Sequence, residues 1–313
     1  MTIDPGLFAD VADALGIDSP AIVEKDVYAV NLLGLLSQLV SPHFELVFAG
    51  GTSLAKTHRS LYRMSEDIDI KLVVRDDTTR GMSRTALKAA RKAALAEIET
   101  LISCSDVFEL EGATKRNEYR YVEYAVRYPR SQDNISALRP DLKLDVTASV
   151  LFEPAILAPV SSLYTAALKL SPEVESFPVV SLHSTISEKL VALLRRTAHV
   201  DRDPSRKDDE TLVRHVYDLH MVTAEGYDAH SLRPLVDAVM KVDVEQFGHQ
   251  HPEFMENPVA ELHHGLDCLR SGAIHQSRYD RFIGPLVYHE SPASWDEALA
   301  TVVELAQQLL RSN

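Results

Sequence analysis

Two aspartates separated by one residue, Asp67 and Asp69, lie in the segment DIDIKLVV (67–74), which alternates as a β-strand does. Successive side chains of a strand point to opposite faces, so both carboxylates share one face with Lys71. Neighbouring carboxylates repel each other unless a cation lies between them or water surrounds them. Mg²⁺ prefers carboxylate oxygens and keeps positions for substrate phosphates. The pattern therefore indicates either a metal site of a nucleotide enzyme or an exposed edge strand.

A glycine turn comes before this strand. The expected strand FELVFA (44–49) runs directly into four residues at which a helix begins, Gly50, Gly51, Thr52 and Ser53. Free N–H groups at a helix N-terminus, together with two hydroxyls, can hold a phosphate. A tight turn with an ordinary N-cap is the alternative. In combination, the turn and the aspartate pair predict an anion site and a metal site at one edge of one sheet.

Two further residues are candidates for this site. Asp145 alternates with apolar residues in LKLDVTASV (142–150), so a neighbouring strand can present it to the same metal ions. Ser65 lies two residues before Asp67, and we include it among the nucleotide-binding residues. A phosphate group on Ser65 would add about two negative charges and repel NTP, so we expect it to act as an off switch.

The elements around these residues change character near residue 150. Before it, the helices expected at 20–39, 53–62 and 82–102 alternate with the strands at 44–49, 67–74, 119–128 and 142–150, and Ser19 with Pro20 marks the start of the first helix. After about residue 180 the apolar spacing is mostly helical. We therefore predict an α+β protein, with a mixed sheet and helices in residues 1–150, a proline-bearing crossing segment at 151–180, and a helical domain at 181–313 that completes the active-site cleft.

Composition narrows the class of protein. The 313 residues are 45% hydrophobic and 25% charged, which is ordinary for a globular protein, and no apolar run is long enough to span a membrane. Two cysteines, Cys104 and Cys268, and an acidic N-terminus predict a cytoplasmic protein. The net charge of −14 argues against wholesale nucleic-acid binding, so an RNA site has to be local.

The motifs resemble those of the AbiEii and MenT type nucleotidyltransferase toxins, members of the DNA polymerase β-like superfamily. The similar segments are EKD (24–26), GGTSLAK (50–56), SEDIDIKL (65–72), SEKLVALLRR (187–196) and HVYDLH (215–220). The resemblance implies transfer of NMP from an NTP to the 3′ end of tRNA, arrest of translation and a cognate antitoxin. We expect two Mg²⁺ ions held by Asp67, Asp69 and Asp145, CTP as the favoured NTP, and neither membrane nor DNA as a partner.

Two residues of the helical half complete the predicted catalytic set. Lys189 lies on the polar side of an amphipathic helix, and the resemblance implies that it binds the triphosphate. Asp218 can orient Lys189 or assist proton removal from the acceptor, or it can simply pair with Arg214 one helical turn earlier. Basic residues at helical spacing are the candidates for RNA binding, or else solvated helix faces: Arg84, Lys88, Arg91, Lys92, Arg195 and Arg196.

Two other functions share these residues. A nucleotidyltransferase that modifies a small molecule, such as an aminoglycoside, needs the same catalytic groups but no basic path for RNA. A non-catalytic interaction module would require Asp67 and Asp69 to turn away from the Gly50 turn. The histidines of FGHQHPEF (247–254) and ELHHGL (261–266) match no structural zinc spacing.

Overall fold

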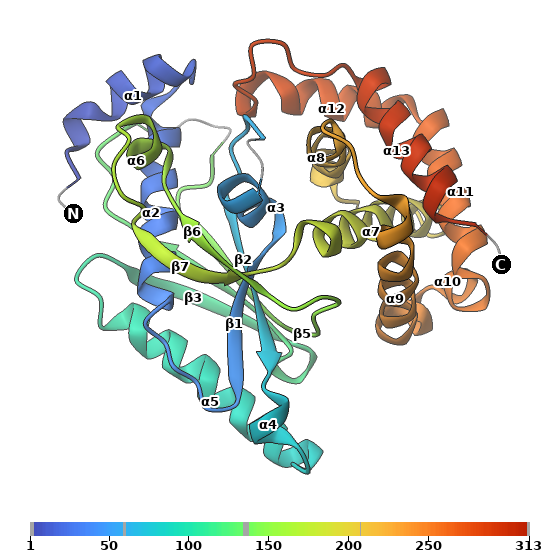
Figure 1. Cartoon of the computed structure of the whole chain (residues 1–313), viewed down its shortest axis with the longest axis horizontal. Helices are drawn as coiled ribbons and strands as arrows, with labels where there is room; N and C mark the ends of the chain where they lie inside the picture. Colours follow the sequence, from blue (N-terminus) through green and yellow to red (C-terminus); the bar gives the residue numbers. More distant parts are fainter. Residues whose placement is uncertain (1–2, 59–60, 134–137, 207, 312–313) are drawn as a thin grey trace. The chain divides into compact units, whose positions relative to one another are not determined.

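A computed structural model describes residues 3–58, 61–133, 138–206 and 208–311. The chain forms two compact units, Met1–Val180 and Ser181–Asn313 (Figure 1). The first contains the β-sheet and the second is helical, so the α+β class predicted from the sequence is confirmed.

The N-terminal unit is built on one mixed sheet in the order β3-β4-β5-β2-β1-β7-β6. Strand β2 lies near its centre, antiparallel to β1 and parallel to β5. The strands are β1 (Phe44–Ala49), β2 (Asp67–Val74), β3 (Glu109–Arg116), β4 (Tyr121–Arg127), β5 (Leu142–Ser149), β6 (Ile156–Val160) and β7 (Val174–Val179).

Helices cover one face of this sheet. Apolar residues of α2 and α5, such as Leu33 and Ile98, share a buried core with Phe48 and Ile70 of the central strands. Because side chains alternate along a strand, the aspartates of β2 point to the opposite face. The α-helices of the unit are α1 (Phe8–Leu15), α2 (Pro20–Leu36), α3 (Gly50–Ser53), α4 (Asp76–Thr79), α5 (Arg84–Ser103) and α6 (Leu163–Ala167).

Segment 151–180 differs from the predicted crossing between halves. It supplies β6 and β7, which extend the sheet beyond β1, and the boundary between the units falls at Ser181. The prolines that suggested a linker are compatible with a strand at this edge. Pro159 lies in the edge strand β6, at the position where the register with β7 shifts, and an edge strand tolerates the missing N–H.

Residues 53–62 also differ from the single helix that was expected. Helix α3 ends at Ser53 and a π-helical turn follows over Leu54–His58. Residues 59 and 60 lie outside the described part of the chain.

The C-terminal unit packs its helices around α7. The amphipathic helix predicted around Lys189 is α7, and its apolar side is buried at Ile186, Leu190, Leu193 and Leu194. Among the described residues, no helix combines the length and apolar character needed to cross a membrane. The helices are α7 (Leu182–Arg202), α8 (Arg214–Thr223), α9 (Ala229–Phe247), α10 (Pro252–Glu256), α11 (Pro258–Ser271), α12 (Ala273–Leu286) and α13 (Trp295–Leu309).

Candidate active site

Strand pairing brings the three predicted carboxylates to one face of the sheet. In the parallel β2–β5 register, Asp69 lies directly opposite Asp145 and Asp67 opposite Lys143. Paired residues of adjacent strands point to the same face. On the other side of β5, Glu123 of β4 is opposite Asp145 and adds a fourth carboxylate that the sequence prediction did not include. The result is a row of acidic groups on three neighbouring strands.

The glycine turn lies directly against one of these acids. Gly50 has φ +74°, a left-handed conformation that favours glycine, and a Cβ built on it would lie 1.9 Å from Asp69 Oδ2. Only a glycine therefore allows the carboxylate of Asp69 to lie against the turn. For Asp69, this contact contradicts the geometry that a non-catalytic module required, in which the carboxylate turns away from Gly50.

The two hydroxyls of the turn point into the protein rather than outward. Thr52 Oγ1 contacts the backbone oxygen of Asp67 and lies 2.8 Å from Ser65 Oγ. Ser53 Oγ donates to the backbone oxygen of Phe48 at 3.2 Å. Both side chains are only 2% exposed, so they fasten the turn to β1 and β2. The groups left for an anion are the first backbone N–H groups of α3, whose N-cap, Ala49, makes no side-chain cap hydrogen bond.

Basic side chains neutralise the acidic row. Lys143 Nζ lies 2.7 Å from Asp145 Oδ2 and 3.9 Å from Asp67 Oδ1. Arg139 Nη1 lies 2.7 Å from Asp67 Oδ1. Burial raises the pKa of Asp145, although Lys143 acts in the opposite direction. The pKa of Lys143 is raised because its hydrogen bond to Asp145 and the surrounding acids outweigh its burial. Lys143 was not among the predicted site residues, although it lies two residues before Asp145 and so on the same face of the strand.

The acids are of the type that a hard divalent cation prefers, but Asp67, Asp69 and Asp145 are not a group whose ligand atoms all lie within 4.8 Å of one another among the described residues. Carboxylate oxygens from Asp67, Asp69 and Asp145 on one face are the ligands that Mg²⁺ prefers. The ammonium of Lys143 lies near Asp67 and Asp145 and supplies positive charge that offsets their mutual repulsion. A cation that binds these oxygens has to displace Lys143 from Asp145. The repulsion between the carboxylates is then offset by Lys143 before the cation binds and by the cation afterwards.

Helix α2 supports the site through the three charged residues of the EKD segment, Glu24, Lys25 and Asp26. Lys25 is fully buried; its Nζ lies 2.6 Å from Glu66 Oε2 and donates to the backbone oxygen of Arg139 at 2.8 Å. Glu66 Oε2 also accepts the backbone N–H of Arg139 at 2.8 Å. Since Glu66 immediately precedes Asp67, this cluster fixes the start of β2 and the loop that supplies Arg139.

The neighbouring acids of α2 hold other loops. Asp26 pairs with Lys56, which follows the glycine turn, and accepts the backbone N–H of Leu163 at 2.6 Å. Glu24 accepts hydrogen bonds from the backbone and the hydroxyl of Ser131, at 2.7 and 2.6 Å. The buried EKD motif therefore connects the segments on which the site is built. In the sequence, its resemblance to a family motif and its interruption of the apolar pattern of α2 are the two signals that could have indicated this role.

Lys189 and Asp218 form a buried pair within the C-terminal unit. Lys189 Nζ lies 2.9 Å from Asp218 Oδ2, and Asp218 is fully buried. The sequence left open whether Asp218 orients Lys189, assists proton removal or pairs with Arg214. The structure contains the contact between Asp218 and Lys189. Burial and the charge of Lys189 lower the pKa of the adjacent His215 to about 3, so His215 is neutral at physiological pH.

The predicted RNA-binding cations are mostly engaged within the protein. On α5, Arg91 is buried, Lys88 pairs with Glu118 at 3.2 Å, and Lys92 lies over the Tyr119 ring. On α7, Arg195 is buried beside Asp243 and Arg196 pairs with Asp209. Arg84 is exposed at the start of α5. Within each helix, most of these cations are therefore paired or buried rather than free in solvent.

Comparison with known proteins places this geometry in a family context. The model of the nucleotidyl transferase AbiEii toxin family, Type IV TA system, matches residues 35–301. Among solved structures, MenT4, a nucleotidyltransferase toxin from Mycobacterium tuberculosis H37Rv, is similar to this chain with a TM-score of 0.66 and 24% identity, over 100% of this chain and 91% of that chain. At this identity the structural likeness establishes the fold. No curated protein matches the sequence.

Proposed function

Because the chain belongs to the AbiEii nucleotidyltransferase toxin family of type IV toxin–antitoxin systems, we propose that it transfers NMP from an NTP to the 3′ end of tRNA in a Mg²⁺-dependent reaction. The observation that supports catalysis most directly is the contact between Gly50 and Asp69. It puts an anion-binding turn against a carboxylate that lies in register with Asp145.

The residues of the sheet hold and orient the nucleotide in this proposal. Asp67, Asp69 and Asp145 bind the metal ions, and the backbone N–H groups of Gly50, Gly51, Thr52 and Ser53 hold the β- and γ-phosphates. Bound Mg²⁺ neutralises charge on the phosphates and polarises the reacting oxygens. The hydroxyl oxygen of the acceptor forms a bond to the α-phosphorus and loses its proton to solvent, the bond between that phosphorus and the oxygen that bridges it to the β-phosphate breaks, and pyrophosphate leaves.

The charged residues around this centre have supporting roles. Arg139 and Lys143 neutralise the carboxylates until metal ions bind. Lys189 neutralises the triphosphate, as the family resemblance implies, and Asp218 fixes the direction of its ammonium group. CTP is the favoured donor nucleotide, arrest of translation through the modified tRNA is the physiological effect, and a cognate antitoxin restrains it.

The experiment that tests this proposal uses Asp69→Asn, which preserves the size of the side chain beside Gly50 but removes its charge. The purified protein is incubated with each labelled NTP, Mg²⁺ and total tRNA. We expect the substitution to abolish transfer because a metal ligand is removed. Asp77→Asn, at an exposed acid of α4, is the matched control and should remain active. Transfer by Asp69→Asn at the wild-type rate would remove the basis of the metal assignment.

Transfer to a small molecule is the second candidate, and the internal pairing of the cations favours it. The variant Arg84→Glu/Lys88→Glu/Lys92→Glu separates the two acceptors while leaving the carboxylates unchanged. If these cations bind the phosphates of tRNA, the variant loses transfer, and the slope of log affinity against log salt becomes shallower by about 0.7–0.9 for each phosphate interaction removed. NTP affinity should stay unchanged. Normal tRNA transfer by the variant would exclude this helix as the RNA path.

A further inference from the structure

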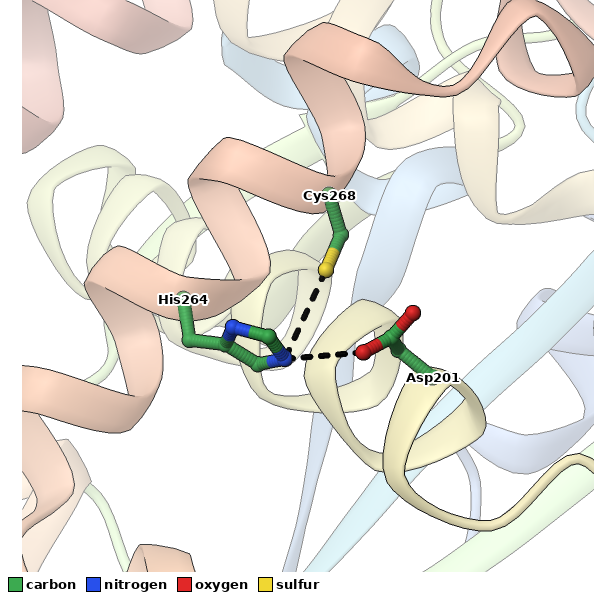
Figure 2. Close-up of side chains that lie close together, drawn as sticks. All are labelled: Asp201, His264 and Cys268. Carbon is green, nitrogen blue, oxygen red and sulfur yellow. Dashed lines mark hydrogen bonds and ion pairs between the residues drawn. The ribbon is translucent and has the colours of Figure 1, made fainter.

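Three side chains of the C-terminal unit converge at one point between α7 and α11. Asp201 is the penultimate residue of α7, and His264 and Cys268 lie four residues apart on α11 (Figure 2). His264 Nε2 is 2.9 Å from Asp201 Oδ2 and 3.6 Å from Cys268 Sγ. Among the described residues, these three form the one group of at least three His, Cys, Asp or Glu side chains whose ligand atoms all lie within 4.8 Å of one another.

The arrangement differs from that of a cysteine nucleophile. In a nucleophile–histidine–acid relay, the acid contacts one ring nitrogen and the nucleophile contacts the other. Here Asp201 and Cys268 both lie at the same atom, Nε2 of His264, as Figure 2 shows. Three donors that face a common point are arranged to surround a cation rather than to pass a proton along a line.

The sulfur–nitrogen distance matches that around a tetrahedral ion, and the nitrogen–oxygen distance is shorter. With metal–sulfur and metal–nitrogen bonds of about 2.3 and 2.05 Å at a tetrahedral angle, sulfur and nitrogen are separated by about 3.6 Å. The separation of Cys268 Sγ and His264 Nε2 is 3.6 Å. The corresponding nitrogen–oxygen separation is about 3.4 Å, so the Asp201 carboxylate has to withdraw by about 0.5 Å. Asp201 is exposed at the end of its helix and can make that adjustment.

The two helices hold this group at a rigid contact. A Cβ on Gly265, next to His264, would lie 2.0 Å from the backbone oxygen of Leu194, so α11 approaches α7 more closely than any other residue would allow. Arg202 and Glu261 form a bidentate ion pair between the same helices, at 3.1 and 3.0 Å. The histidine and cysteine therefore project from a helix whose position relative to α7 is fixed.

Burial and the neighbouring Asp201 set the electrostatic environment of Cys268. Burial and the negative charge of Asp201 raise the pKa of Cys268 to about 11, so its thiol stays protonated beside the carboxylate. A divalent ion would reverse that balance, because it stabilises the thiolate and neutralises the acid. Asp201 and Cys268 also line a cavity of about 250 Å³, with His275 and Arg278 among its other polar side chains, so a fourth ligand such as water has room at the site.

We propose that Asp201, His264 and Cys268 bind a borderline-soft divalent metal ion of the Zn²⁺ type, independently of the carboxylate site in the sheet. Thiolate, imidazole and carboxylate are all zinc ligands, and three protein ligands with one open position is a known coordination pattern for this ion. Binding transfers the Cys268 thiol proton to solvent. His264 keeps its proton on Nδ1 and offers the Nε2 lone pair to the ion.

The test uses the full-length protein after treatment with a chelator, in buffer with millimolar Mg²⁺ to occupy hard-ligand sites. Titration with Co²⁺ should produce a thiolate-to-cobalt charge-transfer band at one equivalent, and Zn²⁺ should displace the Co²⁺. Such a band requires a cysteine ligand, so carboxylate sites do not contribute to it. Zn²⁺ should also raise the Tm of the wild-type protein in proportion to the logarithm of its concentration.

Matched variants separate this site from adventitious binding. Cys268→Ser and His264→Ala should lose the band and weaken Zn²⁺ binding by more than the roughly 10–100-fold that loss of an outer-shell partner costs. Cys104→Ser and His230→Ala, at exposed positions, should leave both measurements unchanged. Asp69→Asn should also bind Zn²⁺ normally, so failure of the proposed activity leaves this test intact. Wild-type protein without the band, or Cys268→Ser with unchanged Zn²⁺ affinity, would overturn the proposal.

Discussion

The buried pair of Lys25 and Glu66 should be worth more to this fold than an ordinary ion pair. Lys25 is fully buried, and burial lowers its pKa even though Glu66 acts in the opposite direction. Lys25→Met keeps most of the side-chain volume but leaves the Glu66 carboxylate buried without its counter-charge. Removing one member of such a pair costs about 3–5 kcal/mol. In a unit of this size, that loss corresponds to a fall in Tm of roughly 6–20 °C.

The effect should be confined to the N-terminal unit, and the chain provides an internal reporter for this. Its single tryptophan, Trp295, is in α13 of the C-terminal unit. Urea unfolding followed by tryptophan fluorescence should therefore change little. Amide hydrogen exchange in β2 and β5 should become faster. Because Glu66 precedes Asp67, we also expect the Mg²⁺ concentration needed for half-maximal transfer to increase.

A double-mutant cycle distinguishes the pair from general packing. Glu66→Gln keeps an oxygen that accepts the backbone N–H of Arg139, so Lys25→Met/Glu66→Gln leaves no buried charge unpaired. We expect the double variant to be more stable than Lys25→Met alone by about 1–3 kcal/mol. Lys169→Met, at an exposed lysine of the same unit, is the control. A free energy of unfolding for Lys25→Met within about 1 kcal/mol of the wild-type value would refute the reasoning, because losses of that size are typical of solvent-exposed ion pairs.

Three further tests address other parts of the structure. Gly50→Ala should abolish Mg²⁺-dependent NTP binding because its Cβ collides with Asp69. Gly81 has a similar positive φ but open space around it, so Gly81→Ala should lose only about 1–2 kcal/mol of stability. Equal effects of the two substitutions in calorimetric NTP titrations would contradict this account. Ser65→Asp should be inactive and Ser65→Ala less impaired in the transfer assay, because the negative charge repels NTP; an active Ser65→Asp would exclude the off switch. The pKa of Glu261 is lowered because hydrogen bonds from Arg202 and His251 outweigh the effect of its burial. The stability that the Glu261 carboxylate contributes is therefore fully present above its ordinary pKa of 4.5 and is lost as the pH falls through its lower pKa in the folded state. Glu261→Gln should accordingly flatten the acid side of the stability curve followed by Trp295 fluorescence, and an unchanged acid slope would show that Glu261 does not govern it.

Local sequence determined the parts of this protein that depend on neighbouring residues. The alternation of DIDIKLVV was enough to predict β2 and to put both aspartates on one face, because the period of a strand is fixed by backbone geometry. Ser19 and Pro20 likewise identified the start of α2, and the side chain of Ser19 caps that helix. The family motifs extended this prediction to the nucleotidyltransferase fold, which the comparisons confirm.

Strand order and charge pairing were decided only in three dimensions. Local patterns do not specify which strand lies beside β2, so the alignment of Asp69 with Asp145, and the addition of β6 and β7 to the sheet, required the folded chain. The same holds for Lys25 with Glu66 and for Asp201 with His264, whose members are distant in sequence. A buried charge is stable only when a partner from elsewhere reaches it, and tertiary packing alone determines which partner that is.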